Sequence, residues 1–448
     1  MLTIGGMMGS GLFVATGMAA HDAGPALGLL FVLGFLAMAV EITALGEMAA
    51  ADPTPGSFLV YAREVLGPGY TFVGGWIYWF SSVLTMSSEV TAAALLSRQW
   101  APVVPLWTWS LLYSAGVVGA NFASVRGFGA VEGVMAAVKT AAVLGFIAFG
   151  AAVVARLVPG AVAPAAPLGR LAAPPLLPAG ARGAGAALLL VLFAYAGTGV
   201  IGMAAAETRD PGRTVPRAVR RTIALSGVMY IGGALVLLLL LPWNRMPETA
   251  SPFVAALRAT GVPHVAAAMN FVLLLAVLST MNAALYANVR VLYTLARAGQ
   301  APAGLGRLSR RGLPAAATWV SAGALGGTIV LAYALPQKAY AYLVTATGFQ
   351  AMFIWLLVLG THLRYRPRLD RTSPGRRFRL PGYPYTTLVP VAAVLAALVG
   401  AWTVGSERVG AGVGFGGIAA ATAVWFAVRG RLRRPAEPEA GGAPAGRP

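Results

Sequence analysis

The chain has 448 residues, of which 58% are apolar and only 10% are charged. Soluble domains carry about 25% charged residues, so this composition excludes a soluble globular protein, including a soluble enzyme. Cysteine is absent, which excludes disulfides and thiolate catalysis, and the three scattered histidines predict no metal site. The sequence also gives no reason to expect a cofactor.

The net charge of +19 would suit nucleic-acid binding, but the basic residues lie mostly in segments between apolar windows. We therefore expect a lipid bilayer as the partner, and no nucleic acid. A membrane helix needs about 20 apolar residues, and the pattern predicts an all-α integral membrane protein with twelve transmembrane helices. The apolar windows cover 1–20, 24–50, 70–97, 105–121, 132–157, 184–206, 219–242, 264–294, 315–335, 339–362, 383–404 and 411–428.

The distribution of basic residues predicts the orientation in the membrane. With a cytoplasmic N-terminus, 23 of the 33 Lys and Arg residues fall in inner loops and the tail, and 8 fall in outer loops. This bias follows the positive-inside rule and an even number of spans. We expect a multi-pass protein of the plasma (inner) membrane with both termini in the cytoplasm.

The beginning of the chain is unusual for a first membrane helix. Only eight residues precede Gly9, the start of a Gly-rich interruption, and no polar segment comes before them. A basic leader with a cleavage site is also absent, which argues against a signal peptide. We expect the true start to lie upstream of Met1.

Two of the windows are interrupted by matching glycine patterns. The first contains Gly9-Ser10-Gly11, and the sixth contains Gly197-Thr198-Gly199. Paired Gly-interrupted segments in corresponding halves point to a transporter substrate site near the bilayer midplane. Unwound backbone exposes N–H groups for a carboxylate and carbonyls for an ammonium group or a cation. Close packing of helices through small residues is the structural alternative.

The sequence around these interruptions resembles the amino acid transporter family of the amino acid–polyamine–organocation permeases. The similarity covers nearly the whole chain up to about residue 365, and the last two windows match mainly in hydropathy. The segments that carry it are Gly5-Gly6-Met7-Met8-Gly9-Ser10-Gly11-Leu12-Phe13, Ala44-Leu45-Gly46-Glu47-Met48, Gly75-Trp76-Ile77-Tyr78-Trp79, Ser88-Glu89-Val90-Thr91, Ala206-Glu207-Thr208-Arg209-Asp210-Pro211 and Met281-Asn282-Ala283-Ala284-Leu285-Tyr286.

The resemblance implies a LeuT-like fold with a five-plus-five inverted repeat, two extra C-terminal helices, and discontinuous first and sixth helices. The expected organisation is a first repeat at 1–158, an external loop at 159–182, a second repeat at 183–363, a basic cytoplasmic loop at 364–382, the last two helices at 383–430 and a disordered cytoplasmic tail at 431–448.

The resemblance also implies a substrate site. The main chain at Gly9, Ser10 and Gly11 would hold the α-carboxylate of an amino acid. Carbonyls near Met7 and in the sixth window would hold the ammonium group, and the ring of Phe193 or Tyr195 would close the pocket. The sixth-window residues of this predicted site are Phe193, Ala194, Tyr195, Ala196, Gly197, Thr198 and Gly199.

The chain departs from the family at one site residue. Family members commonly have Glu directly after the Thr of the second interruption, and this chain has Gly199. The loss removes a candidate proton-linked group and a counter-charge for a cationic side chain. We therefore expect a neutral, apolar amino acid as substrate.

Charged residues inside the apolar windows are candidates for function, because charge is costly in a membrane. Lys139 matches a family lysine that takes the place of a sodium ion, and we expect proton coupling there, with its ammonium group near Gly5 and Ser279. A structural tether and snorkelling to the surface are the alternatives. Glu89 is an equal candidate for the coupling site or for a structural partner.

The remaining acidic residues receive less specific predictions. Glu47 is expected to form a structural or gating pair on the cytoplasmic side, and Glu207 an inner-gate ion pair with Arg290. Glu41 matches no motif and could face a cavity. Glu132 lies seven residues before Lys139 on the same predicted helix, about two turns away and too far for direct pairing, so we expect an interfacial role.

The sequence thus predicts a secondary transporter, not an enzyme, that imports neutral amino acids with protons by alternating access. An exchanger or a sodium symporter is the mechanistic alternative, and a channel or receptor is the alternative of another class. Lys139 argues against sodium, because its ammonium group would take that ion's place. The oligomeric state cannot be predicted.

Overall fold

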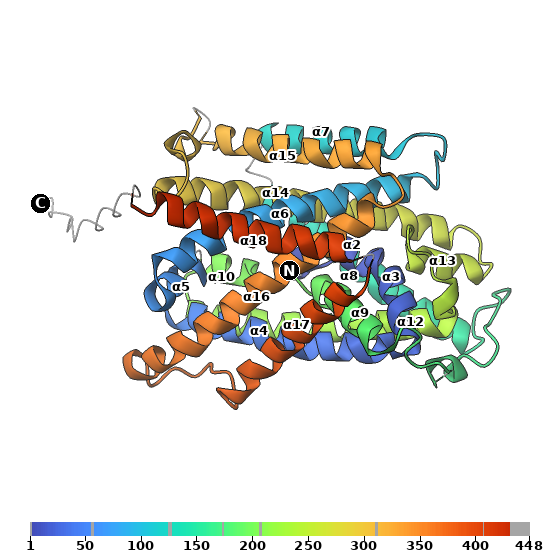
Figure 1. The fold of residues 1–448 in the computed structure, drawn as a ribbon. Coiled ribbons are helices and arrows are strands. Elements are labelled where there is room, and N and C mark those ends of the chain that lie inside the picture. Colours follow the sequence, from blue (N-terminus) through green and yellow to red (C-terminus); the bar gives the residue numbers. More distant parts are fainter. Residues whose placement is uncertain are drawn as a thin grey trace, which may run out of the picture.

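The computed structural model describes residues 2–54, 58–123, 128–172, 174–205, 208–309, 312–405 and 407–430. Helices form nearly all of the regular structure, and these residues contain no strand. Most of the long helices run along one common direction in Figure 1. The predicted tail at 431–448 lies outside the described residues.

The first apolar window is not one helix. It is divided into α1 (Leu2–Met7), α2 (Ser10–Phe13) and α3 (Ala15–Ala23), and the short turn η1 (Gly24–Ala26) leads into α4 (Leu27–Ala51). Glycine allows the chain to leave the helical conformation at Gly9, where φ is −135° and ψ is −154°. The predicted interruption of the first window is therefore present.

The next helices complete the first half of the chain. They are α5 (Phe58–Leu66), α6 (Pro68–Ser97), α7 (Leu106–Ala123) and α8 (Phe128–Val154). Pro68 stands in the first turn of α6, where its missing N–H leaves no helical bond unmade. Between α8 and α9, the described residues form one short helix, η2 (Leu168–Ala172). An irregular connection was predicted there.

The sixth window is also divided. Helix α9 (Gly180–Ala194) ends at the predicted interruption, and α10 (Val200–Ala205) follows it. After α10, the chain forms α11 (Pro211–Ser226), the π-helical turn η3 (Gly227–Ile231) and α12 (Gly232–Leu240) as one rod. The short helices η4 (Trp243–Arg245) and α13 (Pro252–Ala259) lead to the long helix α14 (Val265–Arg297).

The last part of the chain contains the turn η5 (Ala303–Gly306) and four long helices. They are α15 (Ala315–Ala334), α16 (Ala339–Thr372), α17 (Tyr385–Thr403) and α18 (Arg408–Val428). Figure 1 shows α7 and α15 together along one side of the bundle, next to α6 and α14. The described chain begins inside the bundle, because α1 packs on α8 and α14.

Close approach of α9 and α17 depends on two glycines. A Cβ atom on Gly400 would lie 2.4 Å from the Cα atom of Gly185, too close for any side chain. Small residues are the usual means of bringing membrane helices together. This contact holds the helix that ends at the second interruption against the C-terminal part of the chain.

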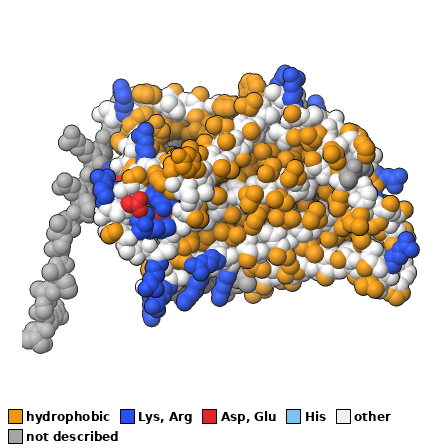
Figure 2. Space-filling view, turned by 90° about the horizontal axis from the view of Figure 1, so that it is seen from below, with side chains coloured by type: hydrophobic (Ala, Val, Ile, Leu, Met, Phe, Trp, Pro, Cys, Tyr) orange, Lys and Arg blue, Asp and Glu red, His pale blue; other side chains and the backbone are white. Residues whose placement is uncertain are grey.

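The outside of the bundle is apolar. Figure 2 shows a broad hydrophobic face with Lys and Arg side chains at its two ends. The exposed apolar side chains of the bundle include Leu29, Leu33 and Leu36 of α4, and Val389 and Val399 of α17. An apolar band flanked by basic residues is the surface that a bilayer requires. Of these two ends, we call the one that carries α5 and residues 373–384 the basic end.

Eight helices among the described residues are long and apolar enough to cross a membrane. The windows predicted at 70–97 and 105–121 are also helical, as α6 and α7. The first and sixth windows are interrupted, so neither forms one continuous span. Twelve spans and the inverted repeat remain predictions.

Candidate substrate and ion site

The two interruptions contact each other in the middle of the bundle. The chain between α9 and α10 takes a left-handed conformation at Gly197, where φ is +104°. A Cβ atom there would lie only 3.0 Å from the carbonyl oxygen of Gly6. Glycine is required at this point both by the backbone conformation and by the close approach of α1. The two matching patterns of the sequence thus meet in space.

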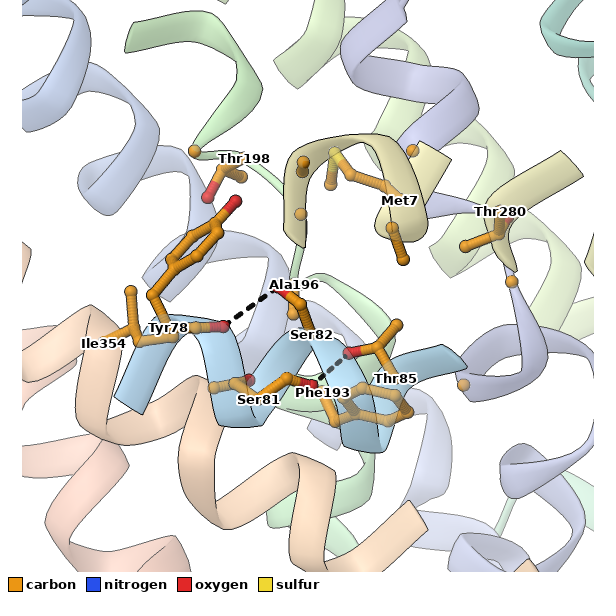
Figure 3. Close-up of a pocket in the computed structure, with 18 of the residues that line it drawn as sticks. Met7, Tyr78, Ser81, Ser82, Thr85, Phe193, Ala196, Thr198, Thr280 and Ile354 are labelled. Atoms are coloured by element: carbon orange, nitrogen blue, oxygen red, sulfur yellow. Dashed lines mark hydrogen bonds between the residues drawn. The ribbon is translucent and has the colours of Figure 1, made fainter. Parts of the chain in front are cut away.

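A cavity of about 140 Å³ lies where they meet. Figure 3 shows its walls, with Met7 and Thr198 on one side and the α6 residues Tyr78, Ser81, Ser82 and Thr85 on another. Helices α14 and α16 contribute mostly small or apolar side chains. The lining residues are Gly6, Met7, Gly9, Gly11, Glu41, Phe58, Tyr78, Ser81, Ser82, Thr85, Glu89, Phe193, Ala196, Gly197, Thr198, Gly199, Thr280, Ala283, Ala284, Ala287, Ala351, Ile354, Trp355 and Val358.

Most residues of the predicted substrate site line this cavity, but Ser10, Ala194 and Tyr195 do not. Of the two rings proposed to close the pocket, only Phe193 reaches the cavity. Tyr195 is buried elsewhere, because its hydroxyl donates to the Phe31 carbonyl at 3.0 Å and its ring stacks on Tyr230 at 4.5 Å. Of the two alternatives for the closing ring, the geometry therefore favours Phe193.

The freed backbone of the first interruption already holds a carboxylate. Both oxygens of Glu89 lie 3.0 Å from the Ser10 N–H, and the Ser10 hydroxyl donates to Glu89 Oε1 at the same distance. Glu89 is buried, and the exposed N–H groups at a helix start favour an anion there. The carbonyl group of the same Ser10 accepts a hydrogen bond from the hydroxyl of Tyr340 at 3.0 Å. The predicted anion-binding backbone is thus occupied by a side chain of α6.

Lys139 lies on the other side of α1. Its Nζ donates to the Gly5 carbonyl at 2.8 Å and to the hydroxyl of Thr280 at 2.9 Å. The expected neighbour Ser279 does not bind it. The Thr280 hydroxyl also lies 2.8 Å from the Met8 carbonyl, so this residue joins the ammonium group to the end of α1.

Ser279 instead binds Glu132. The serine hydroxyl lies 3.0 and 2.9 Å from the two carboxylate oxygens, and Glu132 is only 3% exposed. The interfacial role expected for Glu132 is therefore wrong. Glu132 forms no ion pair with Lys139 within 4.0 Å, and a hydroxyl from α14 serves as its partner. Besides Glu89 of α6, a second buried carboxylate, Glu132, thus lies on the same helix as Lys139.

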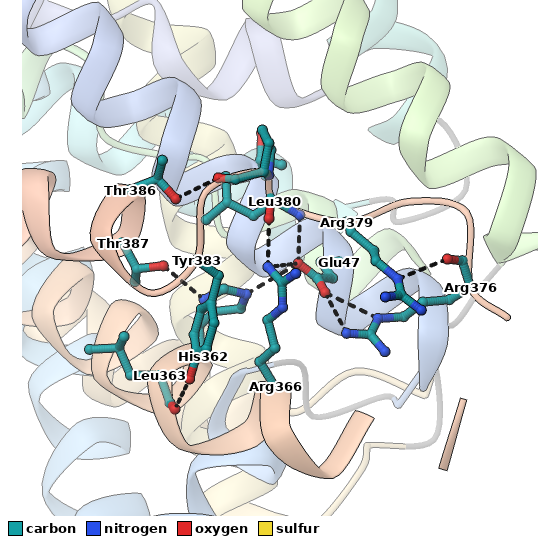
Figure 4. A network of polar contacts seen from close by, with 12 residues as sticks. Glu47, His362, Leu363, Arg366, Arg376, Arg379, Leu380, Tyr383, Thr386 and Thr387 are labelled. Atoms are coloured by element: carbon teal, nitrogen blue, oxygen red, sulfur yellow. Dashed lines mark hydrogen bonds and ion pairs between the residues drawn. The ribbon is translucent and has the colours of Figure 1, made fainter. Parts of the chain in front are cut away.

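A separate polar network closes the basic end, shown in Figure 4. Glu47 is completely buried at the end of α4 and accepts from several groups at once. Arg376 donates to Oε1 at 3.0 Å, whereas the Leu380 N–H at 2.7 Å and Arg366 at 3.3 Å donate to Oε2. His362 Nε2 also lies 3.3 Å from Oε2.

This network ties α4 to α16 and to the loop before α17. Arg366 donates to the Leu380 carbonyl at 2.6 Å and lies 4.7 Å over the ring of Tyr383. Burial raises the pKa of the Tyr383 hydroxyl, which stays protonated and donates to the Leu363 carbonyl at 2.7 Å. Glu47 thus has three basic partners where one pair was expected, and its placement on the cytoplasmic side stays a prediction.

The other predicted gate cannot be followed in full. Glu207 lies outside the described residues. Arg290 lies 4.0 Å over the ring of Tyr286, four residues earlier on α14. The structure therefore places one member of the predicted pair next to an aromatic ring on its own helix.

The sequence did not reveal two residues that hold the first interruption, Tyr230 and Tyr340. Tyr230 donates to the Met7 carbonyl at 3.0 Å from the π-helical turn η3, and Tyr340 binds Ser10. Both are aromatic residues in apolar windows, where packing is the ordinary interpretation. The signal available was their hydroxyl, which needs a partner when buried. The partner could not be identified without coordinates.

Comparisons with known proteins decide the family. A model described as "Amino acid permease" matches residues 1–418. The chain belongs to the amino acid permease family. It is 33% identical to a γ-aminobutyric acid permease of Bacillus subtilis, over 91% of this chain and 87% of that protein. The corresponding Escherichia coli permease is 33% identical over 89% and 86%, and an L-asparagine permease of Streptomyces coelicolor is 34% identical over 92% and 84%.

Family membership and the apolar helices together make this chain a multi-pass membrane protein of amino acid transport, not an enzyme. In this context the central cavity, with unwound backbone on two sides, is the candidate substrate site. The buried cluster of Glu89, Lys139 and Glu132 beside it is the candidate ion site.

Proposed function

We propose that this transporter imports neutral amino acids together with protons by alternating access. The observation that carries the proposal is that the two interrupted helices meet at one cavity, while a buried lysine binds the backbone of one of them. Substrate and coupling groups then act on the same mobile element, the short helix α1. This is the arrangement that coupled transport requires, because each ligand biases the position of a shared element.

A neutral substrate is supported by the charges of the cavity wall. No Lys, Arg or His is among its lining residues, and one of its two carboxylates, Glu89, is already hydrogen-bonded to Ser10. Position 199, where family members commonly carry Glu, is glycine. γ-Aminobutyric acid and L-asparagine, named for the relatives above, are both net-neutral zwitterions at neutral pH. The proposed contacts are main-chain groups of Met7, Gly9 and Gly11 and of residues 196–199.

Proton coupling is supported by the position of Lys139. Its ammonium group lies between the Gly5 carbonyl and the Thr280 hydroxyl, where a sodium ion would need the same oxygen ligands. Loss of a proton would leave the lysine unable to hold both oxygens by charge-assisted bonds. Release of Gly5 would then free α1 to move. Glu89 and Glu132 are the nearby carboxylates that can exchange the proton.

Alternating access is supported by the unequal closure of the two ends of the cavity. Its lining extends to Phe58 of α5 at the basic end, whereas Ser10 does not line the cavity and is held by the hydroxyl of Tyr340. We propose that the basic end faces the cytoplasm of a plasma membrane, as the distribution of basic residues predicts. Closing that route and opening the other would expose the site to the outside for loading, and the reverse change would then carry substrate inward.

The test is uptake of a panel of labelled amino acids into proteoliposomes, with an inward proton gradient, an inward sodium gradient or neither. We expect uptake of neutral amino acids with the proton gradient alone. Uptake only with sodium would overturn the role of Lys139. Uptake only into vesicles preloaded with amino acid would identify an exchanger. Passive flux that does not saturate as the concentration of any substrate is raised would indicate a channel.

A further inference from the structure

One carboxyl group in the cavity wall has no role in the mechanism above. Glu41 of α4 is only 1% exposed, yet it lines the central cavity. Its side chain interacts with that of Thr198 in the second interruption, and its Oε2 has no hydrogen-bond partner among the described residues. Buried carboxyl oxygens are rarely left without a partner, because the lost hydration is costly. A buried acceptor without a partner, on a residue that lines a binding cavity, therefore points to a ligand.

Glu89, the other acid in the wall, differs in this respect. Both of its oxygens receive the Ser10 N–H, and one also receives the Ser10 hydroxyl. Using Glu89 for a substrate side chain would break contacts that stabilise the start of α2. Glu41 can accept a new hydrogen bond at Oε2 without losing any contact that it now makes.

The position of Glu41 is relevant to the glutamate that family members commonly carry and that this chain replaces with Gly199. The family glutamate would follow Thr198 directly, at the position of Gly199, and Gly199 lines the same cavity. Glu41 reaches Thr198 from α4, so a carboxyl group is again present beside the second interruption. The carboxyl group that position 199 lacks is thus present on a different helix.

The chemistry of a carboxyl group makes an uncharged donor the simpler ligand for Glu41 than a cation. A carboxyl group has an oxygen that accepts a hydrogen bond whether it is ionised or protonated, whereas binding of a cation needs the ionised form. The nearby walls contain hydroxyl-bearing residues of α6 and the alanines Ala283, Ala284 and Ala287 of α14. Small side chains leave room for a substrate side chain that extends toward Glu41.

We propose that Glu41 is a specificity residue that accepts a hydrogen bond from the substrate's side chain. The transporter would then select neutral amino acids whose side chain carries an O–H or N–H group, such as a hydroxyl or a carboxamide, over apolar ones of equal size. This inference rests on the proposed function for the location of the substrate. It refines the substrate class and is independent of the coupling ion.

The test uses pairs of amino acids that differ in little but the donor. Threonine and valine have nearly the same shape, as do glutamine and methionine. We expect the wild type to take up or bind threonine at least about tenfold better than valine, because a hydrogen bond to a carboxyl group is worth about 1.5 kcal/mol or more. Glu41→Leu should abolish this preference while leaving valine uptake measurable, and Glu41→Gln should retain part of it.

Thr43→Val is the matched control. Thr43 lies on the same helix, is not a lining residue and donates its hydroxyl to the Ala39 carbonyl of its own helix. We expect its threonine-to-valine ratio to equal that of the wild type. Valine uptake in Glu41→Leu reports that this variant is folded.

Equal uptake of threonine and valine by the wild type would overturn the inference, as would a preference that persists in Glu41→Leu. Ornithine competing better than glutamine would overturn the assignment to neutral donors. Competition binding of the same pairs to purified protein in detergent needs no gradient. It therefore decides the role of Glu41 even if proton-driven uptake, and with it the proposed function, fails.

Discussion

The two buried polar regions of this permease hold their charges in different ways. At the basic end, Glu47 is surrounded by Arg366, Arg376 and His362, and receives the Leu380 N–H as well. In the middle, no ion pair within 4.0 Å joins Lys139 to Glu89 or Glu132, all of which the structure describes. Their partners are hydroxyl and main-chain groups.

The difference follows from what each region has to do. A carboxylate with opposite charges on several sides is held in one arrangement, because removal of any partner leaves a charge buried alone. A charge held by neutral groups can lose or gain a proton without breaking an ion pair. We interpret the basic end as a fixed connection between α4 and α16, and the middle as the part that changes during transport.

The largest effect is expected from removing the central lysine. In Lys139→Ala, proton-driven uptake should fall on the order of 100-fold, the size expected for loss of about 3 kcal/mol in charge-assisted hydrogen bonds. Uptake into proteoliposomes measures this, and exchange of labelled for unlabelled substrate without a gradient shows whether the binding site survives. Full proton-driven uptake in the variant would contradict the proposed coupling role.

The next effect concerns the fixed end. Glu47→Gln removes the charge shared by Arg366 and Arg376 and should lower the free energy of unfolding by about 3–5 kcal/mol. Thermal unfolding of purified protein in detergent measures the change. Glu64→Gln is the matched control, because Glu64 pairs with Arg368 at 2.8 Å where both side chains are partly exposed. That variant should change the stability by less than about 1 kcal/mol, and a similar loss in both would contradict the comparison.

The interrupted helices could be predicted from sequence because their signal is local. A Gly-x-Gly pattern within an apolar window needs no partner to be recognised, and both interruptions are present. Family resemblance then placed Lys139 against the Gly5 carbonyl, which the structure also shows. The helical character of the chain and its apolar surface followed from composition and window length.

The side-chain partners could not be predicted, because they depend on helix rotation. Ser279 and Thr280 differ by one residue, which is about 100° around a helix, and only Thr280 faces Lys139. Tyr195 likewise turns away from the cavity toward Phe31. Glu132 is expected at the interface because Lys139 lies two turns away, too far for pairing, and the hydroxyl that binds it belongs to another helix.

The contact between the two interruptions can be tested with a pair of glycines. Gly197→Ala places a side chain at φ +104° and 3.0 Å from the Gly6 carbonyl, so it should lower stability by about 1–3 kcal/mol. A Cβ on Gly199 would meet nothing within 4 Å, so Gly199→Ala should leave the unfolding temperature nearly unchanged. Equal unfolding temperatures for the two variants would show that the interruptions do not constrain each other.

A third buried carboxyl group extends the comparison to the N-terminal end of α18. Glu407 is 2% exposed, its Oε2 has no hydrogen-bond partner among the described residues, and burial followed by repulsion from Asp22 raises its pKa to about 8. Unlike Glu47, it forms no salt bridge within 4.0 Å among the described residues. Because the pKa is raised in the folded protein from 4.5, folding is favoured at low pH, and this stability is lost as the pH rises toward and through 8.

The smallest expected effect is therefore a change in how steeply the unfolding temperature falls as the pH rises. Glu407→Gln should flatten the decline of the unfolding temperature between about pH 5 and 9, with little change at the acid end, where the wild-type carboxyl group is already neutral. Thermal unfolding in detergent across this range measures it, and Glu64→Gln again serves as the partly exposed control. An unchanged slope would mean that Glu407 is neutralised by another group, and the contrast with Glu47 would then lie in partner number alone. A flattened slope would show that a buried acid without a basic partner is tolerated here because it keeps its proton.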